Sequence, residues 1–415
     1  MKIFMVWAVV MTMFVTPLVA TAAEYEVAID RKASDILPSD KLSGPHYQIQ
    51  ERVVCYGYMD QFTVNSDYGP FQPSSDYALR KLLKEIQAIA ILRQIKGSKV
   101  YLDSVKSAAK MPFEFGKSII TDPVDTISGV PKGVFRLFSN MGTAATSERN
   151  PSEDARWKTL LLLSSYKRDY ASELGVDVYS SNPVLQKELN SLGWAGAIGS
   201  LSVSAALTPF GGPGFLAVKM ARMSLQFNNL LKTEPAPRLR QINAEKLANM
   251  GVSKDLAEQF LNHDSFTPTH QTVIVGSLAT LTAARGQDIF ITRTLTAEDE
   301  ETANYFQNMA ETMRGFNESV SPITDITVAF GLVFAKAKNG SILIPVPVDY
   351  AIWSEHSAGI ITNAIKSYKQ VTGSQPIGKL ELWITGTATP LAKQELEKLG
   401  VGVVENIGPR IDFMN

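Results

Sequence analysis

The first 22 residues constrain this chain more than any other part of its sequence. Lys2 provides a short positively charged start, and an almost wholly apolar run follows from Ile3 to Val19. Small residues at Ala20 and Ala22 then form the small-x-small site that signal peptidase cleaves. This order predicts a signal peptide, cleavage after Ala22, and an exported protein in the periplasm or the extracellular medium. The fold must therefore be built from the residues that follow.

An uncleaved membrane anchor is the alternative for the same segment. Its apolar run is marginal for crossing about 30 Å of hydrocarbon, and Pro17 would break a helix near its end. No cysteine stands at the cleavage site, which argues against a lipid-anchored form. We therefore favour cleavage.

Cys55 is the only cysteine of the chain, so no internal disulfide can form and packing must stabilise the fold. The composition is consistent with a fold stabilised by packing, because 45% of the residues are apolar and 20% are charged, as in ordinary globular domains. Cys55 lies in a strand-like run from Val53 to Tyr58, where burial is the leading interpretation. A disulfide between chains and a reactive thiol remain alternatives.

The net charge of −1 bears on the possible partners. Binding to nucleic acid needs a strongly basic face, so we expect no nucleic acid partner. A protein or another component of the cell envelope fits better, and a peripheral membrane contact is a further possibility.

Hydrophobic periodicity predicts an α+β fold in which a helical region precedes a mixed α/β part. An irregular, β-containing segment with one hairpin is expected over residues 23–72, with turn residues at Ser66–Pro70. A helical region is expected over 73–270, with a possible linker at 141–152. The mixed α/β domain is expected over 271–415.

Several helix boundaries have local signals. Ser75 suits a helix N-cap and Gly97 a helix end, while Asn182 followed by Pro183 predicts another start. Two further helices are predicted at Leu239–Met250 and Ser253–Leu261.

The C-terminal part has the clearest strand pattern. Ile323–Lys336 alternates as one strand, and Asn339-Gly340 predicts a type I′ turn into a second, antiparallel strand. Leu380–Thr385 and Val401–Val404 flank a helix that starts at Thr389-Pro390, which predicts two parallel strands in one sheet. Asp288–Thr292 also resembles a strand.

Two apolar stretches, 112–140 and 189–218, are the most distinctive feature of the middle region. The second lacks charge over Leu189–Val218 and is split at Pro209–Gly214, which predicts a buried helical hairpin bent there. Each arm is too short to span a bilayer. Contact with lipid through both stretches is the alternative.

Several serine-containing patterns resemble those of serine-dependent enzymes. Ser107 and Lys110 match S-x-x-K, Ser180 and Asn182 match S-x-N, and Thr385 precedes a glycine as in penicillin-binding proteins and β-lactamases. However, a nucleophile should open a helix, whereas Ser107 ends a helical pattern. We therefore assign no catalytic residue.

Metal ligands are also scarce. His263 and His270 lie close in sequence, but Pro268 stands between them and no third ligand is apparent. A polar connection between two helices, with Asp264 or Ser265 as a cap, explains them better. We predict no metal and no cofactor.

The ends of the C-terminal strands are the place where a site is best sought. Gly386 precedes a helix N-terminus, which can hold an anion, and Asp349-Tyr350 and Glu355-His356 follow other strands. The leading functional hypothesis is an exported, non-enzymatic binding or assembly protein. A lipid-interacting protein and a hydrolase of unrecognised type are the alternatives.

Overall fold

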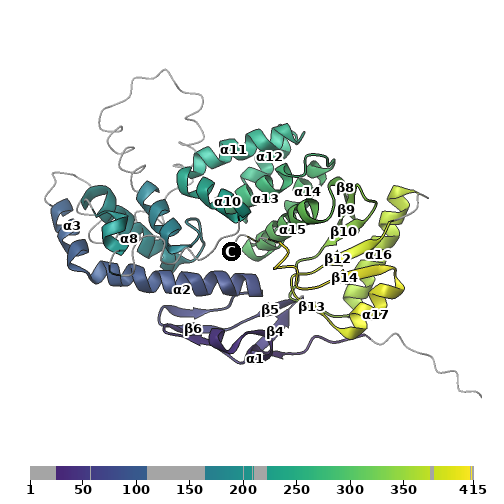
Figure 1. Ribbon diagram of the computed structural model, residues 1–415, viewed down its shortest axis with the longest axis horizontal. Helices are drawn as coiled ribbons and strands as arrows, with labels where there is room; N and C mark the ends of the chain where they lie inside the picture. Colours follow the sequence, from purple (N-terminus) through teal and green to yellow (C-terminus); the bar gives the residue numbers. More distant parts are fainter. Residues whose placement is uncertain are drawn as a thin grey trace, which may run out of the picture.

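The computed structural model describes residues 25–56, 58–109, 164–199, 201–207, 209, 222–373, 378–411 and 413. The predicted signal peptide, the apolar stretch 112–140 and the predicted linker at 141–152 lie outside these residues. The described residues form an α+β fold, as the sequence predicted (Figure 1). The proposed division into domains stays a prediction.

Two small antiparallel sheets form the N-terminal part. The turn predicted at Ser66–Pro70 joins two of their strands, β6 and β7. Two more hairpins, β2–β3 and β4–β5, accompany it where the sequence suggested only one. The first sheet has the order β1-β4-β5, and the second has the order β2-β3-β6-β7. Their elements are β1 Arg31–Lys32, α1 Ala33–Ile36, a 3-10 turn Ser39–Lys41, β2 Ser43–Gly44, β3 Tyr47–Ile49, β4 Arg52–Tyr56, β5 Met59–Gln61, β6 Val64–Ser66 and β7 Gly69–Phe71.

The long helix α2, Asp76–Gly97, connects the N-terminal sheets to the helical region (Figure 1). It begins at the predicted cap, because the Ser75 hydroxyl accepts a hydrogen bond from the backbone N–H of Ala78. The first half of α2 packs Leu79 and Ile86 against the small sheets. The second half packs against the helix at residues 164–174 and against α8, Pro183–Gly199.

The end of α8 differs from the predicted hairpin. The chain leaves the helix after Gly199 and forms the short helix α9, Val203–Leu207. The predicted bend at Pro209–Gly214 falls almost wholly outside the described residues. The described part of the uncharged stretch packs inside the protein, with Leu189, Leu192, Trp194 and Ala195 buried.

Helix α13, Pro268–Ala279, is central in the helical region. All residues from Thr269 to Leu278 are buried, as expected for a helix that has neighbours on every side. Gly276 permits a close approach, since a Cβ there would lie 2.3 Å from the Phe227 ring. The surrounding helices are α10 Arg222–Thr233, α11 Ala236–Asn249, α12 Lys254–Leu261, α14 Gln287–Thr294 and α15 Glu300–Ser319. Helix α3, Lys99–Ala109, packs instead against α8 and α2.

A five-stranded mixed sheet organises the C-terminal part, with the order β14-β12-β10-β9-β8. β12 and β14 are parallel, and β9 and β10 are antiparallel, so both predicted pairings are confirmed. Helices α12 to α15 pack on one face, where Trp383 is buried, and α16 and α17 pack on the other, where Leu382 is buried. The elements are β8 Ile323–Ala329, β9 Leu332–Ala337, β10 Ile342–Pro345, β11 Tyr350–Ala351, α16 Glu355–Thr372, β12 Leu380–Trp383, β13 Thr387–Ala388, α17 Pro390–Lys398 and β14 Val401–Val404.

Three local predictions in this part were wrong. The run 323–336 is not one strand, because Phe330 and Gly331 both have positive φ and form a tight turn between β8 and β9. The turn after β9 is not type I′, since only Gly340 has positive φ there and Asn339 does not. The predicted strand at 288–292 lies in α14, whose buried residues Gln287, Phe290, Ile291 and Thr294 have helical spacing.

None of the helices in the described ranges has both the length and the apolar character needed to cross a membrane.

Candidate functional site

Asp349, which follows β10 in the chain, lies at the contact between the C-terminal sheet and the N-terminal part. Its Oδ2 atom accepts hydrogen bonds from the backbone N–H groups of Asp60 and Asp76, at 3.1 and 3.2 Å. In return, the N–H groups of Asp349 and Tyr350 both donate to the Tyr58 carbonyl at 3.1 Å. The sequence pointed to this position, and the structure shows that its neighbours come from the distant N-terminal segment.

Asp60 is the second member of this acidic pair. The Arg31 guanidinium donates to Asp60 Oδ2 at 2.6 Å and also stacks over the Tyr350 ring, 4.3 Å from its centroid. Asp60 is only 1% exposed, and its Oδ1 atom has no hydrogen-bond partner among the residues that the structure describes. The guanidinium of Arg31 is therefore paired with Asp60, while Asp349 is held by backbone N–H groups.

Burial controls the protonation of both acids. Loss of solvent raises the pKa of Asp349 to about 7, although the backbone N–H groups of Asp60 and Asp76 oppose the shift. Burial also raises the pKa of Asp60, while Arg31 lowers it. Asp349 can therefore gain or lose a proton near neutral pH.

The backbone around the pair has two unusual conformations. Tyr58 has φ 76° and Ser75 has φ 98°, values that non-glycine residues rarely adopt. Tyr58 directs its carbonyl to Asp349, and Ser75 donates its N–H to the Asp60 carbonyl at 2.9 Å. Strained backbone conformations persist only where surrounding contacts hold them, so the contacts of Asp349 and Asp60 keep Tyr58 and Ser75 in these conformations.

Cys55 lies directly opposite Asp60 in the β4–β5 ladder and is buried as a free thiol. Burial raises the pKa of this thiol, and the nearby Asp60 raises it further. Cys55 is therefore a protonated, enclosed thiol in the structure, as the leading interpretation of the sequence expected.

The turn before α17, where the sequence suggested an anion, is occupied by carboxylates of the chain itself. The Thr389 hydroxyl donates to Glu26 Oε2 at 2.6 Å, and the Ala388 N–H donates to Glu405 Oε1 at 2.7 Å. Glu26 Oε2 also accepts from the Trp353 N–H at 2.6 Å. The turn therefore holds the N-terminal segment in place.

Glu355 and His356, the other predicted place, are exposed in the first turn of α16. No hydrogen bond of the described residues links them to Asp349.

The two histidines considered as metal ligands have structural contacts. His270 Nδ1 accepts from the Thr267 N–H at 3.1 Å, and its Nε2 lies 2.9 Å from Asn304 Oδ1. His263 Nε2 lies 3.2 Å from the Leu295 carbonyl. The helix cap in this segment is Thr267, rather than Asp264 or Ser265, and the helix it caps is α13, which contains His270. Within the described ranges, no group of three or more His, Cys, Asp or Glu side chains is arranged to hold a metal ion.

The serine motifs do not converge on a catalytic group. Ser107 lies in the last turn of α3, whereas Ser180 and Asn182 donate to the buried carboxylate of Glu85 at 2.6 and 2.9 Å. Thr385 donates to the Val348 carbonyl at 2.9 Å. Ser180 and Asn182 thus stabilise the packing between α2 and the segment before α8, whereas Thr385 stabilises a contact in the C-terminal part.

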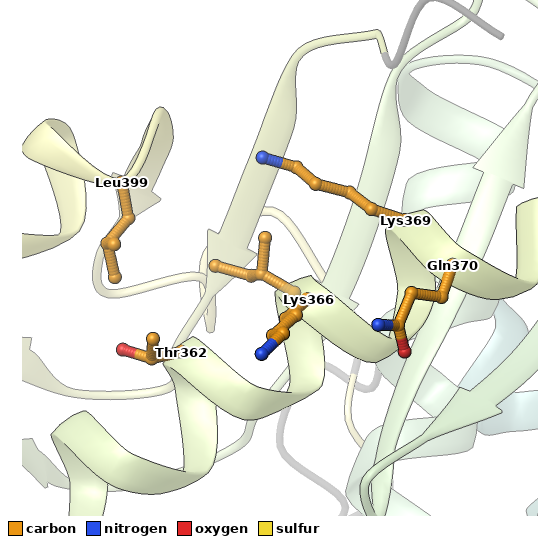
Figure 2. A pocket seen from close by; sticks show the side chains of 6 residues that line it. Thr362, Lys366, Lys369, Gln370 and Leu399 are labelled. Carbon is orange, nitrogen blue, oxygen red and sulfur yellow. The ribbon is translucent and has the colours of Figure 1, made fainter. Parts of the chain in front are cut away.

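A surface hollow of about 420 Å³ between α16 and the end of α17 is a candidate site that sequence reasoning missed (Figure 2). Buried Ile365 and half-buried Leu399 provide an apolar surface, and Lys366 and Lys369 bring two exposed ammonium groups. Thr362 and Gln370 complete this α16–α17 hollow with a hydroxyl and an amide.

The two lysines of the hollow have no ion-pair partner among the described residues. This differs from Lys393 and Lys398 on the neighbouring helix, which pair with Glu405 and Glu395 at 3.1 and 2.6 Å. Val371, next to Gln370, is 67% exposed. Two free cations beside apolar side chains favour a ligand with a negative group and an apolar part.

We compared the chain with models of protein families, with curated proteins and with solved structures, and none of them matches it.

Proposed function

We propose that this protein is an exported, non-enzymatic binding protein that attaches to an anionic amphiphile of the cell envelope through the α16–α17 hollow. The observation that carries the proposal is the pair Lys366 and Lys369, which have no ion-pair partner in the described ranges and lie beside the apolar side chains of Ile365 and Leu399. The predicted signal peptide supports a place of action outside the cytoplasm.

The charge arrangement favours an anionic ligand. Lysines three positions apart on a helix lie on the same side, so both ammonium groups of α16 can approach one phosphate or carboxylate. Each lysine near an anionic lipid surface contributes about 1 kcal/mol, so the pair would contribute roughly 2 kcal/mol at low salt. The apolar side chains would accept the first carbons of an acyl chain.

The apolar stretches 112–140 and 189–218 are the alternative surface through which the protein would contact lipid. The first stretch lies outside the described residues, and the described part of the second is largely buried. The hollow is therefore the part of the structure that favours lipid contact.

Vesicle flotation tests this proposal. Mature protein should float with vesicles that contain phosphatidylglycerol and should not float with pure phosphatidylcholine vesicles. The Lys366→Ala/Lys369→Ala variant should lose roughly tenfold or more in affinity. The matched control is Lys187→Ala/Lys254→Ala, which removes the same charge from exposed positions elsewhere. Equal binding by both double variants would contradict the proposal.

A further inference from the structure

The acidic pair links two parts of the chain that are far apart in sequence. Asp349 belongs to the segment after β10, whereas Asp60 belongs to β5 and Asp76 to the first turn of α2. A further hydrogen bond joins the hydroxyl groups of Tyr58 and Ser354, whose oxygen atoms lie 3.1 Å apart. We call this contact, between residues 58–76 and 349–354 together with Arg31, the seam.

The charged and titratable groups around Asp349 come from every element of the seam. Arg31 of β1 and Asp60 of β5 form an ion pair, and Asp76 of α2 pairs with Arg80 at 2.5 Å. Cys55 of β4 and Tyr350 of β11 complete the surroundings. Arg31 is directed to Asp60, so the carboxyl of Asp349 has backbone N–H groups but no cation of its own among the described residues.

We propose that the carboxyl of Asp349 is a proton-controlled clasp, which holds the N-terminal β segment on the C-terminal sheet when neutral and loosens it when ionised. One Asp349 oxygen accepts both backbone N–H groups, so a neutral carboxyl can keep these bonds. Ionisation of Asp349 places a second buried negative charge beside Asp60. Keeping that charge away from water costs free energy, a cost that the neutral carboxyl does not have.

The direction of the pH effect follows from linkage. An aspartate in an open, hydrated segment has a pKa of about 3.9, whereas burial in the closed seam raises the pKa of Asp349 to about 7. The closed seam therefore binds the proton more tightly than the open one. The free energy that Asp349 contributes to the closed seam is therefore greatest below pH 4, decreases as the pH rises towards 7, and is smallest above pH 7. The equilibrium constant for opening of the seam should increase over this range by roughly a hundredfold to a thousandfold.

Cys55 provides a built-in reporter, because it is the only cysteine, it is buried, and it lies opposite Asp60. We would measure its rate of reaction with dithiodipyridine in wild-type protein and in Asp349→Asn. The amide keeps an acceptor oxygen and cannot ionise. Division of the two rates at each pH removes the pH dependence of the thiol reaction itself.

The wild-type rate relative to Asp349→Asn should rise at least tenfold between pH 5 and pH 8. Glu26→Gln is the matched control, since Glu26 attaches the same N-terminal segment to Trp353 and Thr389. The Glu26→Gln variant should change the labelling rate of Cys55 by the same factor at pH 5 and at pH 8. A ratio of wild type to Asp349→Asn that stays constant between pH 5 and pH 8 would overturn the proposal.

Carboxyl titration of the wild-type protein by ¹³C NMR gives a second test that needs no variant. One buried aspartate should titrate near pH 7. If every aspartate titrates below pH 5, the clasp does not exist.

Discussion

The backbone N–H of Asp60 donates to the carboxylate of Asp349 at 3.1 Å, across a separation of 289 residues. This bond and its neighbours attach the small N-terminal sheets to the C-terminal sheet. Because both side chains are acidic and buried, the same contact makes the stability of the protein depend on pH.

The first prediction concerns the pH dependence of unfolding. The pKa of Asp349, about 7, is higher than the 3.9 of an unfolded aspartate. Wild-type protein should therefore lose on the order of 4 kcal/mol of unfolding free energy between pH 4 and pH 8 from this group alone. Asp349→Asn should remove that loss, whereas Asp349→Ala should destabilise at every pH because two N–H groups lose their acceptor. Urea unfolding at several pH values measures this, and parallel curves for wild type and Asp349→Asn would refute it.

The second prediction concerns Arg31 and Asp60. Arg31→Met should cost about 3–5 kcal/mol at pH 8, because Asp60 is 1% exposed and would be a buried charge without a cation. Asp60→Asn in the same background should restore part of the loss. A double-mutant cycle by chemical denaturation measures the coupling. Additive effects of the two changes would show that the ion pair is not coupled.

The third prediction concerns Glu85 of α2. Glu85→Ala should destabilise by about 2–4 kcal/mol, since Ser180 and Asn182 would lose the carboxylate that accepts their hydrogen bonds. Glu397→Ala, on the exposed side of α17, is the control and should change stability by no more than about 0.5 kcal/mol. Similar thermal midpoints for the two variants would be inconsistent with a structural role of Glu85.

The fourth prediction uses two glycines with opposite surroundings. A Cβ on Gly386 would lie 1.9 Å from the Asp349 carbonyl oxygen, so Gly386→Ala should destabilise by about 3 kcal/mol or more. A Cβ on Gly359 in α16 would meet no atom of the described residues within 4 Å, so Gly359→Ala should stabilise by about 0.5–1 kcal/mol. Calorimetry should show shifts of opposite sign, and shifts of the same sign would argue against this packing.

Local signals were sufficient to predict many elements from the sequence. Ser75, Asn182, Ser253 and Thr389 each cap the helix that the sequence assigned to them. The parallel pairing of β12 and β14 also follows from local order, because a capped helix of suitable length separates them.

The failures have physical reasons. Phe330 continues the alternating pattern, so nothing local indicated that this bulky, 58% exposed residue would adopt positive φ in a turn. Asp349 was identified as a place to look, but its partners could not be predicted, because Asp60 and Asp76 reach it only through the tertiary fold. The hollow likewise depends on how α16 and α17 pack. Only the spacing of Lys366 and Lys369 was visible beforehand.

Residue-level amine labelling tests the proposed binding function most directly. Mature protein would be acetylated with and without phosphatidylglycerol vesicles, and the modification of each lysine would be read by mass spectrometry. Lys366 and Lys369 should be protected by the vesicles, while Lys187 and Lys254 should react as before, and high salt should abolish the protection. Unchanged reactivity of Lys366 and Lys369 in the presence of bound vesicles would contradict the assignment of the α16–α17 hollow as the binding site.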